Sequence, residues 1–432
     1  MRTSKGLWSR DFLLLWQGQA VSLAGSSLSA VALSLWIVDA TGSAAALGTI
    51  MMVGSITGLA LSPLAGAAAD RYPRVSILVG CDLALGLLSL ALAGAARGYG
   101  KNPALALGAV LLLQAGASAA NAFFATAARA ATSDLVPPAL VPAANAATMA
   151  VLQVAGLAGK GAGGVVYRLL GAPMIFLLDG LTFFASAATE SRIQVPPKPP
   201  TPTRGWRQRL RDLAADTRAG FAYVVGHPGL RILVAVNGCV AFFLDPLLVL
   251  LPFLVKDPRF LGVAGDWYGW LLGGFGLGTL GGYWLAAFLR SRTLRAGRLA
   301  TGCLALGGLG FAALGVVRTP AAALCLMTGN GTLLGLFSNH VVSLVQTRVP
   351  SDMRARALGV FQTLSLCLSP VALGLSGLVA EALDRRVDVL FVACGATVAA
   401  VALGAGSRES YRAFLCGGDD PAGSAGTLPR PE

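Results

Sequence analysis

Twelve apolar runs, each long enough to cross a lipid bilayer, constrain this chain of 432 residues more than any other feature. A bilayer core of about 30 Å needs roughly 20 apolar residues in a helix. The runs lie at about 13–38, 45–69, 75–96, 104–128, 142–167, 172–189, 230–255, 267–289, 298–317, 321–347, 357–383 and 388–406. They are continuous rather than alternating, which excludes a transmembrane β-barrel. The sequence therefore predicts an all-α integral membrane protein with twelve transmembrane helices.

Composition supports this fold class. Hydrophobic residues make up 55% of the chain and charged residues 12%, whereas a soluble protein carries about 25% charged residues. The net charge of +13 would suggest nucleic-acid binding in a soluble protein. Its distribution gives a different explanation. With the N-terminus in the cytoplasm, 24 of the 33 Lys and Arg fall in inner segments and 8 in outer segments. The charge therefore indicates topology, with both termini cytoplasmic, and no nucleic-acid partner.

The polar segments divide the chain into four parts. Residues 1–189 form a first half of six helices, and 230–406 form a second half of six. Residues 190–229 are predicted to be a cytoplasmic linker, in which a Pro-rich stretch precedes an amphipathic helix from Trp206 to Tyr223. Residues 407–432 are predicted to be a disordered cytoplasmic tail, because their end is rich in Gly and Pro. Two equivalent halves are typical of transporters that rock about a central site.

Patterns for enzymatic or metal chemistry are missing from the sequence. It contains no HExxH, GxSxG or Walker A pattern, and its seven cysteines form no CxxC pair. The stretch from Gly276 to Gly281 matches GxGxxG, but it lies within an apolar run with no strand before it, so we interpret it as a close-packing glycine face. We therefore expect no enzyme, no cofactor and no bound metal.

A short charged loop between the second and third runs gives the first family resemblance. Residues Gly66, Asp70, Arg71 and Arg74 follow the spacing G-x-x-x-D-R-x-x-R. An acid and two bases in a short loop can latch two helix ends together. The loop resembles the signature of the major facilitator superfamily, in which such a latch stabilises the outward-open state. The alternative is an ordinary positive loop on the inner side of the membrane.

Further segments resemble one branch of that superfamily, which holds the enterobactin exporter and the macrolide efflux proteins. These segments begin at Trp16, Asp39, Asp134, Phe176 and Val349, and the resemblance covers about residues 10–405. Departures limit what it implies. Lys160 stands where the branch's antiporter motif has a proline, and the arginine that many drug/proton antiporters carry in the fourth helix is missing. The proton relay of those exporters therefore does not carry over directly.

Charged groups inside apolar runs are the main candidates for substrate binding or proton coupling, because burying a charge in a membrane is costly. Lys160 is the first candidate, either as a group in a central cavity or as a structural partner of Asp179 or Asp245. Asp179 belongs to the branch pattern and fits a structural or a coupling role. Asp245 fits a cavity-facing role, and Asp82 a packing or latch-supporting one.

Three uncharged or weakly basic residues complete the candidate set. His340 titrates near neutral pH, although a single histidine on an apolar helix also suits a hydrogen-bonded core position. Gln19 and Asn237 are candidates to line the transport path, with helix–helix hydrogen bonding as the alternative.

The resulting expectation is a secondary active transporter that exports a small molecule by alternating access. Because no nucleotide-binding sequence exists, an ion gradient, expected to be of protons, would supply the energy. The resemblance implies a drug, siderophore or other secondary metabolite as substrate, an antiporter mechanism and a monomer in the inner (plasma) membrane. Two alternatives remain open: an importer or lysolipid flippase with the same fold, and a membrane sensor or scaffold that transports nothing.

Overall fold

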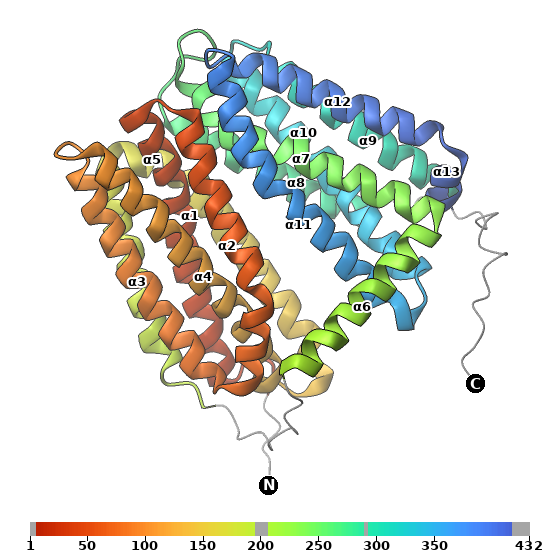
Figure 1. Cartoon of the computed structure of the whole chain (residues 1–432), viewed down its shortest axis with the longest axis horizontal. Coiled ribbons are helices and arrows are strands. Elements are labelled where there is room, and N and C mark those ends of the chain that lie inside the picture. The colour runs from red at the N-terminus through yellow and green to blue at the C-terminus, as the bar shows by residue number, and fades with distance from the viewer. Residues whose placement is uncertain (1–5, 195–205, 289–292, 417–432) are drawn as a thin grey trace. The chain divides into compact units, whose positions relative to one another are not determined.

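The computed structural model describes residues 6–194, 206–288 and 293–416, and Figure 1 colours its helices in chain order. The elements are α1 (Arg10–Thr41), α2 (Ala44–Arg71), α3 (Arg74–Gly98), α4 (Pro103–Leu135), the 3₁₀ turn η1 (Pro138–Leu140), α5 (Val141–Glu190), α6 (Trp206–Gly226), α7 (Pro228–Lys256), α8 (Asp266–Phe288), α9 (Thr293–Leu314), α10 (Pro320–Arg348), α11 (Ser351–Ala382), α12 (Val387–Ser407) and α13 (Glu409–Cys416). The described residues contain no strand. The all-α fold class is confirmed.

Ten of the described helices are long and apolar enough to cross a membrane. This number is consistent with twelve crossings, since α5 alone covers the two runs predicted at 142–167 and 172–189, and α11 adds a shorter apolar helix at Cys367–Ala382. Gly171 interrupts α5 with φ 73° and ψ 164°, and Pro173 follows it. Because only glycine adopts such a backbone readily, and proline cannot continue a helical ladder, the chain turns here.

Local signals set several helix boundaries. The Ser9 side chain accepts a hydrogen bond from the backbone N–H of Phe12 at the start of α1, and Gly42 ends this helix with φ 61°. The Asn102 side chain caps α4 in the same way, with Pro103 as its first residue. These are the residues that satisfy free backbone groups at helix ends.

The described helices group into two units. The first contains the described residues up to 194, the beginning of α8 (263–273) and the end of α11 (373–381). In this unit α5 packs against α1 and α3, and α4 packs against α2 and α3. The second contains the described residues within 206–262, 274–372 and 382–416, in which α9 packs against α10 and α12. The predicted linker helix is present as α6, which packs on α7. The Pro-rich stretch and the end of the predicted tail lie outside the described residues.

Candidate functional site

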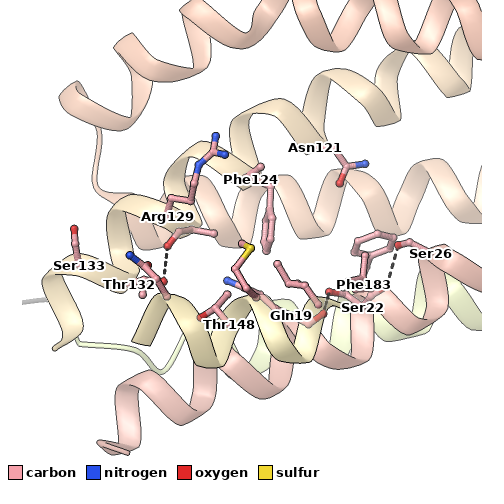
Figure 2. A pocket seen from close by; sticks show the side chains of 16 residues that line it. Gln19, Ser22, Ser26, Asn121, Phe124, Arg129, Thr132, Ser133, Thr148 and Phe183 are labelled. Carbon is pink, nitrogen blue, oxygen red and sulfur yellow. Dashed lines mark hydrogen bonds between the residues drawn. The ribbon is translucent and has the colours of Figure 1, made fainter. Parts of the chain in front are cut away.

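A cavity of about 450 Å³ lies between α1, α4 and α5 in the first unit. Figure 2 shows its lining, in which the rings of Phe124 and Phe183 lie among polar side chains. Its wall is formed by Gln19, Ser22, Leu23, Ser26, Asn121, Phe124, Ala125, Ala128, Arg129, Thr132, Ser133, Asn145, Thr148, Met149, Leu152 and Phe183. Nine of these sixteen residues carry polar groups, while the wall surface itself is mostly apolar, a combination that suits a small-molecule site. Gln19, a predicted site residue, is among them.

Arg129 is the one charged side chain in this lining. It also lines a neighbouring hollow of about 400 Å³ between α2 and α4. In the sequence analysis it is one of the 24 basic residues counted in the inner segments, and in the structure it lies within α4, which continues to Leu135. A guanidinium offers five donors in a planar fork and stays protonated, so it can bind an anionic or carbonyl group of a ligand.

Asp179 lies next to this cavity, on the part of α5 that follows the kink. It is 5% exposed, and hydroxyl groups surround it. Ser89 donates a hydrogen bond to Oδ2 at 3.0 Å, and the Ser26 hydroxyl lies 3.4 Å from Oδ1. Ser29 also faces the carboxyl. Since Ser26 lines the cavity as well, one hydroxyl connects Asp179 to the cavity wall.

Lys160 does not join this cluster. Its side chain is exposed, and its backbone carbonyl lies beside Gly269 at the beginning of α8. Within the described residues, the side chains that contact the Asp179 carboxyl are serines rather than Lys160. The structural pairing of Lys160 with Asp179 is therefore not seen, and a role for Lys160 in transport stays a prediction.

Asp82 belongs to a second buried acidic site, which the sequence did not reveal. Asp82 on α3 and Glu190 at the end of α5 are both 0% exposed and interact electrostatically. None of their four carboxyl oxygens has a partner with hydrogen-bond geometry, and the Ser186 hydroxyl that faces Asp82 also lacks one. The pair lies near an apolar cluster that contains Leu78 and Ile193. From the sequence, Glu190 looked like an ordinary residue of the linker.

One residue of the predicted latch, Arg74, pairs with an acid outside the latch motif. Arg74 forms a salt bridge with Asp134 at the end of α4, and both side chains are mostly buried. Arg74 also donates to the carbonyl oxygen of Ala130 at 2.8 Å. Asp70 and Arg71 are exposed at the end of α2, and Gly66 has open space beside it. The loop thus ties α3 to α4 through Arg74.

The remaining candidates lie in the second unit. Asp245 on α7 is accessible and faces the Ser369 hydroxyl of α11. Asn237, two turns earlier on α7, is half-buried. His340 on α10 is half-buried too, and its Nε2 atom has no hydrogen-bond partner. The described residues hold no cluster of three or more side chains suited to a metal ion.

Comparison with known families identifies the chain at the level of its superfamily. The model of the Major Facilitator Superfamily matches residues 15–374. The chain belongs to this superfamily and is therefore a multi-pass membrane transporter.

Individual relatives add detail. The chain is 25% identical to macrolide efflux protein A of Streptococcus pyogenes over 285 residues, which are 64% of this chain and 68% of that protein. Two solved structures share its fold. The nucleoside transporter NupG has a TM-score of 0.69 and 12% identity, covering 91% of this chain and 98% of its own. A bacterial homologue of the iron transporter ferroportin in the inward-facing state has a TM-score of 0.71 and 15% identity, covering 92% and 99%.

Proposed function

We propose that this transporter exports a small amphiphilic molecule in exchange for protons, by alternating access in the inner (plasma) membrane. The cavity of the first unit is the substrate site, and Asp179 is the group that couples substrate and proton. The observation that carries the proposal is the position of Ser26, whose hydroxyl lines the cavity and lies 3.4 Å from the Asp179 carboxyl.

The wall of the cavity supports an amphiphilic substrate. Phe124, Phe183 and Met149 offer apolar and aromatic surface, while Gln19 and Asn121 offer amide groups. Such a combination holds a ligand by apolar contact and orients it by a few hydrogen bonds. Arg129 adds a fixed positive charge, which favours a substrate with an anionic or strongly polar group.

The environment of Asp179 supports a coupling role. The single hydroxyl proton of Ser26 has two acceptors, the Ser22 carbonyl oxygen at 2.9 Å and Asp179 Oδ1 at 3.4 Å. An ionised carboxylate attracts this proton more strongly than a neutral acid does. Protonation of Asp179 would therefore turn the Ser26 hydroxyl toward Ser22 and change the cavity wall.

Asp179 lies where α1 and α5 pack closely against each other. A Cβ atom at Gly25 would lie 2.9 Å from Asp179 Oδ1 and 2.6 Å from Thr182 Oγ1, so α1 and α5 approach each other closely at this point. A change in the charge of Asp179 therefore acts where these two helices meet. In transporters, packed helices can have two stable arrangements, and a local change in charge can shift them from one to the other. Such shifts produce alternating access.

Export is supported by the likeness to macrolide efflux protein A. Drugs, siderophores and other secondary metabolites are the substrate classes we propose. Lys160, Asp245, His340 and Asn237 are proposed as further residues on the path, and the protein is proposed to act as a monomer. The alternatives of the same fold are an importer and a lysolipid flippase.

Inside-out membrane vesicles test the direction and the energy source together. With an inward-acidic proton gradient, we expect a labelled substrate such as a macrolide to accumulate in the vesicles, and a protonophore to abolish this. Accumulation only in right-side-out vesicles would indicate an importer. Lysolipid movement without movement of drugs would indicate a flippase.

A further inference from the structure

Another hollow, of about 380 Å³, lies in the second unit between α9, α12 and α13. In Figure 1, α13 turns back at the end of α12, beside α9. The hollow is lined by Gly297, Arg298, Thr301, Gly302, Leu403, Gly406, Ser407, Arg412 and Leu415. The distribution of Lys and Arg assigns this end of the helices to the cytoplasmic side of the membrane.

Small residues and a fixed short helix create this hollow. A Cβ atom at Gly302 would meet nothing within 4 Å, and the absence of one at Gly406 lets the Thr301 side chain approach α12 closely. Tyr411 holds α13 in place, because it is 0% exposed and its hydroxyl faces Thr301. Burial raises the pKa of Tyr411 to about 12, so it remains neutral. Phe414 packs directly on Gly229 at the beginning of α7. The walls of the hollow are therefore defined by the packed core.

Two arginines give the hollow its charge. Arg298 on α9 and Arg412 on α13 are both exposed, and neither forms a salt bridge with a carboxylate among the described residues. Arg348 offers a contrast, since its guanidinium lies over the Phe414 ring of α13, 5.9 Å from the centroid. Two unpaired guanidinium groups at one hollow are suited to an anion with several oxygens.

The surroundings of the hollow are apolar and lipid-facing. Leu403, which lines it, is 63% exposed, and Leu299 and Leu306 on α9 are 50% and 57% exposed. Leu299 and Leu306 are seven residues apart, so they lie on one face of the helix. An anion bound by the two arginines would therefore have acyl-chain surface beside it.

We propose that this hollow binds the phosphodiester headgroup of an anionic phospholipid of the inner leaflet. Arg298 and Arg412 hold the phosphate oxygens, Thr301 and Ser407 add hydroxyl groups, and Leu403 packs against an acyl chain. Basic pockets between helices at the cytoplasmic side are suited to such headgroups. Inorganic phosphate could bind the same arginines, but it has no acyl chain to pack against Leu403.

The test is the unfolding temperature of the full-length purified protein in detergent, measured during titration with phosphatidylglycerol, phosphatidylcholine or inorganic phosphate. We expect phosphatidylglycerol alone to raise it. Each of the substitutions R298Q and R412Q should raise the phosphatidylglycerol concentration needed for half of the maximal stabilisation by about fivefold, since one basic residue near an anionic headgroup contributes roughly 1 kcal/mol. The double substitution should abolish the stabilisation by phosphatidylglycerol.

Arg231→Gln is the matched control, because Arg231 is an exposed arginine at the beginning of α7, outside the hollow. It should leave the effect of phosphatidylglycerol unchanged. An equal loss in R231Q, or an unchanged effect in the R298Q/R412Q double variant, would overturn the proposal. Equal stabilisation by inorganic phosphate would overturn the assignment to a lipid. If the arginine variants fail to fold, S407E serves instead, since a carboxylate at this exposed position lowers the charge of the hollow from +2 to +1 and should weaken the effect at least as much as either single substitution. An unchanged effect in S407E would then overturn the proposal.

Discussion

The Ser26 hydroxyl lies 3.4 Å from Oδ1 of Asp179 and forms part of the cavity wall at the same time. A buried acid on α5 is thus separated from a substrate-sized cavity by one hydroxyl on α1. Anything that changes the charge of this acid also changes a group that a ligand in the cavity would touch. This relationship links the proposed substrate site to the proposed coupling site without a long chain of residues.

Arg129 is expected to determine how tightly substrate binds. Replacing it with glutamine removes the fixed charge of the cavity but keeps donor groups, so we expect substrate affinity to fall by about tenfold or more, as for a lost hydrogen bond to a charged group. Equilibrium binding of labelled substrate to purified protein measures this. Arg97→Gln, an exposed arginine at the end of α3, should leave affinity unchanged. Equal affinity in wild type and R129Q would exclude Arg129 from the substrate site.

The pair of Arg74 and Asp134 is expected to stabilise the first unit. Asp134→Ala leaves a mostly buried guanidinium without its carboxylate, and we expect a loss of about 2 kcal/mol. Denaturation in detergent, followed by circular dichroism, measures the change. The exchanged pair R74D/D134R should recover part of the stability that R74D alone loses. No recovery would mean that the contribution of Arg74 comes from its bond to the Ala130 carbonyl oxygen.

Close packing of α8 against α10 predicts a sharp difference between two neighbouring glycines. A Cβ atom at Gly278 would clash with the Thr328 carbonyl oxygen of α10, whereas a Cβ at Gly281 meets nothing within 4 Å. We expect Gly278→Ala to destabilise the protein by about 1–3 kcal/mol and Gly281→Ala to be tolerated. Thermal unfolding of both variants checks this. Similar unfolding temperatures would contradict the observed approach of the two helices.

The buried carboxyls of Asp82 and Glu190 predict variants that are more stable than the wild type. No cation compensates them among the described groups that act on them, and their oxygens lack partners. Replacing both with the amides Asn and Gln removes a repulsion and a desolvation cost while keeping the shape of the side chains. We expect the D82N/E190Q variant to unfold at an equal or higher temperature. A clear decrease would show that the acids hold a cation in the protein as purified.

The sequence was sufficient for the fold class, because the signal lies in the composition of each run. Residues 142–189 show a boundary that the sequence did predict. Two helices were expected there, and the structure has two helical parts of α5 that meet at a kink at Gly171, where the glycine has a φ of 73°. The stretch around Gly276 was interpreted as a packing face, and Gly278 is indeed in close contact with α10.

Partners of buried charges were much harder to predict. Glu190 lies near the end of an apolar run, where charged residues usually flank a helix, so it was not assigned to the interior. The serines around Asp179 come from α1 and α3, and their register against α5 depends on packing that no local pattern records. An unusual density of Ser residues in the first run, at positions 22, 26 and 29, was a usable signal for a buried polar partner.

The most direct test of the account is transport by the Asp179→Asn variant. Asparagine keeps the size of the side chain and can accept hydrogen bonds from the serines, but it cannot carry the charge that coupling requires. Substrate transport is measured in proteoliposomes in two modes, driven by a proton gradient and as exchange of labelled for unlabelled substrate without a gradient. Asp39→Asn, at an exposed carboxyl hydrogen-bonded to Tyr167, serves as control. We expect D179N to lose gradient-driven transport and keep exchange. Gradient-driven transport at the wild-type rate in D179N would contradict the proposed coupling role of Asp179.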